Sequence, residues 1–291
     1  MKNHLDQKLE ALQESPIAQL SLASSELFHS NFLYWLSTAC KGFTRAVFNE
    51  CLKTTLPKIE GAQREKKNID LSINLSGGRN LIIENKVKSI AYPDQLDAYS
   101  AKFNSDNHTF VLLSLIEPSF LESSAYKTKD GSIWKLITYK DLQKAISLNL
   151  ENDDLLESDT KQLKSCSFTY ARSLISDYAF YLRALVSIYE ANTLAKTNRL
   201  LLPRKTTDKL GKLSSGIIKW RYAQLAEMLR KKLSSKEAPF ALHRSARSYW
   251  EATSNAVLIS SGMTRSLGLL DFKFTLSTAD PSSAKRLALG I

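Results

Sequence analysis

Cysteine is scarce in this sequence of 291 residues, and no cysteine-based motif is present. Cys40, Cys51 and Cys166 are odd in number and widely spaced, without a CxxC pair or a Cys/His cluster. A disulfide framework is therefore excluded, and nothing suggests a zinc site, because both need several cysteines at short spacings. We interpret the three cysteines as small buried side chains of a protein in a reducing cytoplasm.

Long apolar runs and nucleotide-binding loops are missing as well. The beginning of the chain, MKNHLDQKLEALQESP, alternates charged and apolar residues without the apolar run of a signal peptide. No later stretch approaches the roughly 20 apolar residues that a membrane-spanning helix needs, and no P-loop, internal repeat or low-complexity tract is present. We therefore expect a cytoplasmic protein that has no membrane partner.

Positive charge is present in excess, but it is concentrated in the last third of the chain. The net charge is +11, and eighteen Lys and Arg face six Asp and Glu after residue 194, so the preceding part is close to neutral. A basic surface attracts polyanions such as nucleic acid. Because the length exceeds that of a usual single domain, we predict a core domain over 1–193 and a basic α+β region over 194–291 that binds substrate or a partner.

Hydrophobic periodicity predicts an α/β core, a mixed sheet flanked by helices. Helices are expected over residues 26–41, 93–103, 140–148 and 170–189, strands over 109–116 and 132–139, and a β-hairpin over 67–89. The run TFVLLSLI at 109–116 is continuously apolar, which is typical of a central strand with helices on both faces. The polar stretch 150–165 is expected to be a loop.

The hairpin is the most informative segment, and its loop length decides which side chains share a face. Apolar residues occupy alternate positions from Ile69 to Leu75, ahead of a turn signal at Gly77-Gly78. A two-residue loop would place the apolar rows of the two strands on opposite faces, because a one-residue slip reverses every side chain. A three-residue loop, Gly77 to Arg79, makes the rows coincide, so burial of the common face favours it.

The same register gathers polar side chains on the other face of the hairpin. Asp70 is then expected to lie opposite Lys86, and Ser72 opposite Glu84. Adjacent carboxylates repel each other unless a cation joins them, and oxygen ligands suit Mg²⁺. With Lys86 beside them to orient or deprotonate water or to offset phosphate charge, such a site can hydrolyse phosphodiester bonds.

The spacing of these residues resembles a known signature. Asp70, then thirteen residues, then Glu84-Asn85-Lys86 after an apolar LII run is similar to the Asp…Glu-x-Lys motif of the PD-(D/E)XK nuclease superfamily. Many members have proline before the aspartate, where this chain has Ile69. Downstream, QLDAY at 95–99 resembles the Gln-xxx-Tyr motif of many members, and ELFHSNFLYWL resembles an upstream helix of one bacterial branch that supplies a Glu near the metal. The resemblance covers roughly residues 20 to 190.

The resemblance implies a restriction-endonuclease-like fold and a Mg²⁺- or Mn²⁺-dependent endo- or exonuclease, with DNA favoured over RNA as the substrate, in DNA processing or phage defence. The catalytic candidates are Asp70, Glu84, Lys86 and Gln95. The candidate cation ligands are Asp70, Glu84, the backbone carbonyl of Asn85, and Glu26. The candidate substrate contacts are Gln95 and Tyr99, to which the basic region adds Arg230, Lys231 and Lys232. His29, three residues after Glu26, is a further candidate.

Simpler interpretations of the same residues stay open. The hairpin charges can form an ordinary salt bridge on a solvated sheet face, and Glu26 is explained by the dipole of the helix that it begins. His29 and Tyr99 can be core residues, and the basic residues can be a solvated surface. At the level of function, the alternatives are a catalytically silent module that binds nucleic acid or a protein, and a toxin or defence component that needs a partner chain. A homo-oligomer is also compatible with the sequence.

Overall fold

The computed structural model describes residues 25–193, apart from positions 66, 67, 88, 90, 104–106, 119, 162, 164 and 165, together with the single positions 208, 217, 220, 221 and 224. The chain divides into two compact units, Met1–Ala191 and Asn192–Ile291. The helices and strands whose bounds the structure describes belong to the first unit. The predicted domain boundary at 193/194 and the α+β character of the basic region stay predictions.

Within the described residues the first unit contains one six-stranded mixed sheet in the order β1-β2-β3-β4-β6-β5. The strands are β1 (Ile59–Arg64), β2 (Leu71–Leu75), β3 (Arg79–Lys86), β4 (His108–Ser114), β5 (Ala125–Lys127) and β6 (Ile133–Thr138). β1, β2 and β3 pair antiparallel, whereas β3, β4 and β6 run parallel and β5 pairs antiparallel to β6. The predicted α/β class with a mixed sheet is confirmed.

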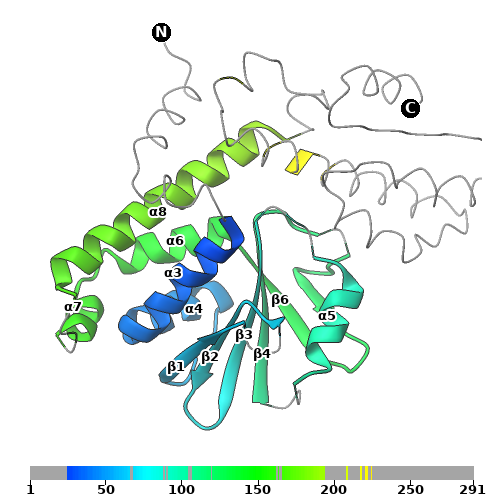
Figure 1. Cartoon of the computed structure of the whole chain (residues 1–291), viewed down its shortest axis with the longest axis horizontal. Coiled ribbons are helices and arrows are strands. Elements are labelled where there is room, and N and C mark those ends of the chain that lie inside the picture. Colours follow the sequence, from blue (N-terminus) through cyan, green and yellow to red (C-terminus); the bar gives the residue numbers. More distant parts are fainter. Residues whose placement is uncertain are drawn as a thin grey trace, which may run out of the picture. The chain divides into compact units, whose positions relative to one another are not determined.

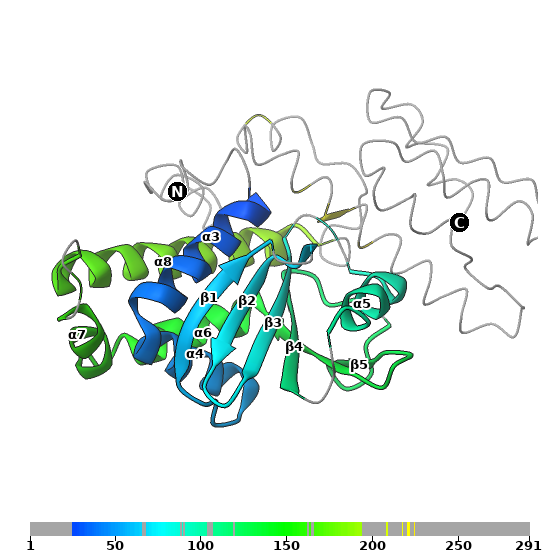
Figure 2. The ribbon, with the colours of Figure 1, turned by 60° about the horizontal axis from the view of Figure 1, so that its bottom comes forward.

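Helices cover both faces of this sheet. They are α3 (Ser25–Ala39), α4 (Lys41–Leu52), α5 (Pro93–Ser100), α6 (Tyr139–Asn149), α7 (Asp154–Thr160) and α8 (Phe168–Ala191). α3 packs on β1, β2 and β3, α4 and α6 pack against β6, and α8 packs on α6 (Figure 1). α5 lies on the other side of the sheet (Figure 2). None of the helices within the described part of the chain is long and apolar enough to cross a membrane.

The central position of the predicted strand 109–116 is confirmed. β4 lies between β3 and β6, and its residues Phe110 to Leu113 are at most 1% exposed. On the face toward α5, a core cluster joins Ile82, Phe110 and Trp134 to Leu96 of that helix. This cluster anchors α5 over β3, beside the strand segment that carries Glu84 and Lys86.

Four elements were not predicted: α4, β1, β5 and α7. The polar stretch 150–165 was expected to be a loop, but it contains α7, whose Leu156 is 1% exposed. Asp159 of α7 accepts hydrogen bonds from the backbone N–H groups of Gly42 (3.0 Å) and Phe43 (2.9 Å). These donors at the start of α4 have no partner inside the helix. Asp159 therefore caps the start of α4, while the buried Leu156 packs α7 against the rest of the domain.

The structure corrects the predicted register of the hairpin. β2 and β3 pair with Leu71 opposite Ile83, Ser72 opposite Ile82 and Leu75 opposite Arg79. The loop has three residues as predicted, but it runs from Ser76 to Gly78 and not from Gly77 to Arg79. Ser72 therefore faces Ile82 and not Glu84. The same register, continued by one residue, places Asp70 opposite Glu84 and not opposite Lys86.

The backbone of the turn is compatible with either register. Gly77 and Gly78 adopt positive φ angles of 78° and 71°, which residues with a Cβ rarely adopt. Both registers keep the two glycines in the loop and differ only at its ends: Ser76 belongs to the observed loop, and Arg79 begins the extended strand β3 and pairs with Leu75. The pairing differs from the prediction by two residues, which leaves every side chain on its predicted face. The apolar rows coincide as predicted, and the polar residues still share the other face.

Candidate active site

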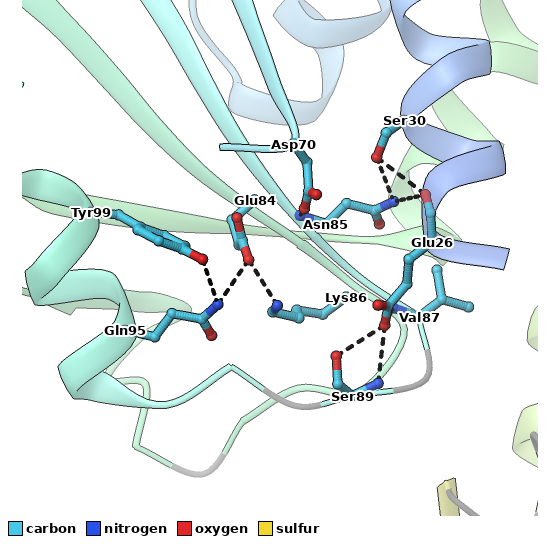
Figure 3. Close-up of polar contacts among 10 residues, drawn as sticks. All are labelled: Glu26, Ser30, Asp70, Glu84, Asn85, Lys86, Val87, Ser89, Gln95 and Tyr99. Atoms are coloured by element: carbon cyan, nitrogen blue, oxygen red, sulfur yellow. Dashed lines mark hydrogen bonds and ion pairs between the residues drawn. The ribbon is translucent and has the colours of Figure 1, made fainter. Parts of the chain in front are cut away.

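Asp70, Glu84 and Lys86 come together at one end of β2 and β3 (Figure 3). Asp70 immediately precedes β2, and its Oδ2 accepts a hydrogen bond from the backbone N–H of Asn85 at 2.7 Å. Lys86 Nζ lies 2.7 Å from Glu84 Oε1, with side chains 13% and 3% exposed. The interpretation of these charges as a solvated surface pair does not hold, because this ion pair is buried.

Helix α5 adds two of the predicted residues. The Gln95 side-chain Nε2 donates hydrogen bonds to Glu84 Oε1 and to the hydroxyl of Tyr99, each at 3.0 Å. Gln95 and Tyr99 are four residues apart and therefore share one face of the helix. Pro93 at the first position fixes where α5 begins. Lys102, which the sequence did not single out, has its Nζ 4.9 Å from the centroid of the Tyr99 ring.

Burial dominates the electrostatics of this site. It raises the pKa of Glu84 from its ordinary value to about 8, against the opposing charge of Lys86 and with a further contribution from Asp70. Burial also raises the pKa of Asp70, although the Asn85 N–H and Lys86 oppose the shift. For Lys86, burial lowers the pKa, but the Glu84 carboxylate more than offsets this and the pKa lies above its ordinary value. The carboxylates would therefore be stabilised by a further cation.

Unsatisfied oxygen atoms indicate where a cation fits. Among the described residues, Glu84 Oε2 and Gln95 Oε1 are buried without a hydrogen-bond partner, which is rare for buried polar atoms. In an extended strand the N–H and C=O of one residue point to the same side, so the Asn85 carbonyl faces the side of Asp70. Two carboxylates and a carbonyl are hard oxygen ligands, and this donor set fits Mg²⁺ or Mn²⁺.

The described residues offer few ligands for such an ion. No group of three or more His, Cys, Asp or Glu side chains placed to hold a metal ion occurs in the part of the chain that the structure describes. Mg²⁺ characteristically keeps several waters and is held by one or two carboxylates together with substrate phosphate. The arrangement of Asp70 and Glu84 therefore fits a cation whose remaining ligands are water molecules or a phosphate group.

Glu26 lies in the first turn of α3 and contacts the chain just after β3. Its Oε1 accepts hydrogen bonds from the backbone N–H of Val87 (3.1 Å), from the N–H of Ser89 (3.1 Å) and from the Ser89 hydroxyl (2.9 Å). These contacts hold the segment that follows Lys86. The predicted role of Glu26 as a cation ligand stays a prediction.

The remaining candidates are His29 and the basic residues of the last third. His29 is fully buried, its Nδ1 lies 2.8 Å from the Tyr178 hydroxyl, and its ring stacks on that of Tyr181. Burial lowers the pKa of His29 to about 3, so its ring is neutral at ordinary pH. These contacts are those of a residue in the hydrophobic core, and a catalytic role of His29 stays a prediction. The positions of Arg230, Lys231 and Lys232 lie outside the described residues.

No role was predicted for the Asn85 side chain. Only the backbone carbonyl of this residue was predicted to take part, as a cation ligand. This amide points to the face opposite Glu84 and Lys86, where it contacts α3 and α6. Its partners Ser30 and Tyr139 were not singled out either. A signal was present, because Asn85 interrupts an otherwise apolar row that includes Ile83 and Val87.

Comparison with known proteins gives one match. A family model described as the PD-(D/E)XK nuclease superfamily matches residues 17–172. This range is more than half of the chain and contains all six strands and the helices α3 to α7. It also contains Asp70, Glu84, Lys86 and Gln95. No curated protein and no solved structure matches the chain.

Proposed function

The chain belongs to the PD-(D/E)XK nuclease superfamily, and we propose that it is a cation-dependent nuclease that hydrolyses phosphodiester bonds, in DNA in preference to RNA. The observation that carries this proposal is the environment of the Glu84 carboxylate. Its buried carboxylate contacts Lys86 and Gln95 through one oxygen, and the other oxygen has no partner among the described residues. The preference for DNA and a setting in DNA processing or phage defence rest on the family resemblance.

The cation would be held by the Asp70 and Glu84 carboxylates and the Asn85 carbonyl, with Glu26 as a further candidate. When bound, Mg²⁺ or Mn²⁺ stabilises the charge that develops on the phosphate and lowers the pKa of water. The protein's own part is to hold two carboxylates close together in a largely buried place at the end of β2 and β3. Burial of Glu84 provides that environment.

Lys86 and Gln95 act on the substrate side in this proposal. The carboxylates around Lys86 favour its protonated form, which offsets negative charge on the phosphate and donates hydrogen bonds to the attacking water. Gln95 holds Glu84 through its amide N–H, and its free carbonyl can accept a hydrogen bond from water. We propose that Tyr99, one turn later, contacts a phosphate oxygen, a role supported by its hydrogen bond with Gln95.

The proposal is tested by incubating the purified full chain with supercoiled, linear and single-stranded DNA and with RNA. We expect cleavage of DNA with Mg²⁺ or Mn²⁺, complete loss with a chelator, and recovery when the cation is restored. Conversion of supercoiled to linear DNA would indicate an endonuclease, and release of nucleotides from linear ends an exonuclease. Binding of DNA without cleavage under every cation condition would contradict the proposal and favour the silent binding module.

The basic region is proposed to hold the nucleic acid backbone. Each phosphate contact that is lost lowers the slope of log affinity against log salt by about one unit. Replacing Arg230, Lys231 and Lys232 with glutamine should therefore flatten the slope by up to roughly three units, with little change in the rate at saturating substrate. Binding isotherms at several salt concentrations, in a Glu84→Gln background, measure this. Identical slopes would mean that these three residues do not contact the substrate.

A further inference from the structure

One buried side chain beneath the site is polar where packing alone favours an apolar one. On the face of β3 toward α3, Leu81, Ile83 and Val87 are at most 1% exposed, and Asn85 continues their row at 2%. Burying an amide costs free energy unless its hydrogen bonds are made inside the protein. Leucine would fill the same place without that requirement. The presence of asparagine here therefore calls for a role that an apolar residue does not serve.

The Asn85 amide makes hydrogen bonds through both of its polar atoms. Its Nδ2 donates to the backbone carbonyl of Glu26 at 2.9 Å and to the Ser30 hydroxyl oxygen at 3.2 Å. Its Oδ1 accepts a hydrogen bond from the Tyr139 hydroxyl. We call Asn85, Ser30, Tyr139 and the Glu26 carbonyl the Asn85 network. It ties β3 to the first turns of both α3 and α6 (Figure 3 shows the α3 side).

The partners of Asn85 are themselves held in place. Tyr139 is fully buried and is the first residue of α6. The preceding Thr138 caps this helix, and Asp141 completes a capping box with it, so the helix start is fixed relative to the end of β6. Ser30 is 3% exposed and donates its hydroxyl hydrogen to the Glu26 carbonyl at 3.1 Å. Asn85 is therefore hydrogen-bonded to two helices, α3 and α6, whose contacting residues are themselves held in place.

The backbone of Asn85 connects this network to the candidate active site. Its N–H donates to Asp70 Oδ2 at 2.7 Å. Because side chains alternate along a strand, Glu84 and Lys86 on either side of Asn85 point to the opposite face. A rotation of the strand at Asn85 would therefore move all three site residues. Hydrogen bonds are directional and fix this rotation, whereas an apolar contact at the same place would not.

We propose that the Asn85 network positions Asp70, Glu84 and Lys86 for the reaction, with Asn85, Ser30 and Tyr139 acting as positioning residues. The inference rests on the proposed nuclease function. Groups that orient the residues in contact with a reacting centre typically contribute about 10- to 100-fold to activity or metal affinity when they are removed. The proposal thus explains why a buried amide occupies position 85, where leucine would pack equally well.

The test compares two tyrosines that differ in whether they contact Asn85. Tyr139→Phe removes the hydrogen bond to Asn85, and Tyr178→Phe removes the equally buried hydrogen bond to His29. Both should lower Tm by a similar amount, about 2–4 °C. We expect Tyr139→Phe to lower kcat by about 10- to 100-fold with KM changed by less than about twofold. Tyr178→Phe should keep the kcat of the wild type.

A second variant separates positioning from stability. Combining Asn85→Leu, Tyr139→Phe and Ser30→Ala removes the whole network without leaving a buried side-chain group unpaired, so Tm should be close to that of the wild type. Ser37→Ala, which removes another buried hydroxyl of α3, is the matched control. We expect the triple variant to fold and to keep the low kcat. Wild-type kcat in the triple variant, or equal kcat in the two tyrosine variants, would overturn the inference.

Amide exchange in the cation-free protein gives a result that does not depend on cleavage. The N–H groups of Asn85 and Val87 bond to Asp70 and Glu26 across this part of β3. Loss of about 1 kcal/mol at Tyr139 should speed their exchange by about fivefold, and Tyr178→Phe should not. If the wild type cleaves nothing, the nuclease proposal fails. The amide exchange rates of Tyr139→Phe and Tyr178→Phe then decide by themselves whether the Asn85 network holds the end of β3 in place. Equal exchange in both variants would then refute it.

Discussion

A Glu84→Gln variant is expected to lose cation-dependent cleavage by on the order of a thousandfold. Glutamine keeps the shape of the side chain, and its carbonyl can still accept hydrogen bonds from Lys86 and Gln95. What it removes is the negative charge that would hold the cation. Asp70→Asn should have a similar effect for the same reason. Single-turnover cleavage at saturating Mg²⁺, with calorimetry for cation binding, measures both losses.

The same variant should be more stable than the wild type at alkaline pH in the absence of cation. Because burial raises the folded-state pKa of Glu84 to about 8, the native protein loses stability relative to the unfolded chain as pH rises from about 4.5 to 8. Glutamine does not titrate. The variant's advantage should therefore be absent at pH 4, grow through this window by on the order of 2–4 kcal/mol, and level off above pH 8.

Binding of the cation should make the wild type more stable than Glu84→Gln, and this reversal is a control for the prediction. Saturating Mg²⁺ should raise the Tm of the wild type, because it binds only the folded protein, and leave the Tm of Glu84→Gln unchanged. Glu157→Gln removes an exposed carboxylate that pairs with Lys161 and should behave as the wild type throughout. Cleavage retained in Glu84→Gln or Asp70→Asn would show that these carboxylates do not hold the catalytic cation.

Lys86→Met is expected to lower kcat by about 10²- to 10⁴-fold while cation affinity is largely kept. Methionine fills the space of the lysine stem, but it cannot donate to water or offset charge on the phosphate. Removing Lys86 also takes away the charge that lowers the pKa of Glu84, so protons compete more strongly with the cation at neutral pH. Cation affinity should therefore be compared over a series of pH values from neutral to alkaline, so that competition by protons is separated from the loss of the lysine.

Lys140→Met is the matched control for this variant, because it removes another ion-paired lysine, which bonds to Glu190 at 2.8 Å. It should leave both kcat and cation affinity unchanged. Calorimetric titration with Mg²⁺ and single-turnover cleavage separate binding from chemistry. Loss of cation binding in Lys86→Met, combined with a full rate at saturating cation, would mean that Lys86 supports the metal and has no part in the reaction.

The sequence by itself determined the composition of the site's face. The alternation from Ile69 to Leu75, the apolar approach to Glu84 and the Gly77-Gly78 turn placed Asp70, Glu84 and Lys86 on one side of a hairpin. The period of a strand is two residues, so burial of the apolar rows fixes which side each residue takes. The continuous apolar run of β4 likewise fixed the centre of the sheet, because a strand covered on both faces has no polar side.

Only the tertiary structure decided which residues of that face lie opposite each other. A shift of two residues keeps every side chain on its face, so burial cannot distinguish the predicted register from the observed one. In the structure Arg79 pairs with Leu75, and Ser76 takes the place in the loop that was predicted for Arg79. The contact between Asp159 of α7 and the start of α4 likewise joins residues that are far apart in the sequence. The role of the Asn85 side chain was also hidden, because Ser30 and Tyr139 lie 55 and 54 residues away in the sequence. Alternation along a strand specifies the side to which an amide points, whereas its hydrogen-bond partners are specified only when the helices pack on the sheet.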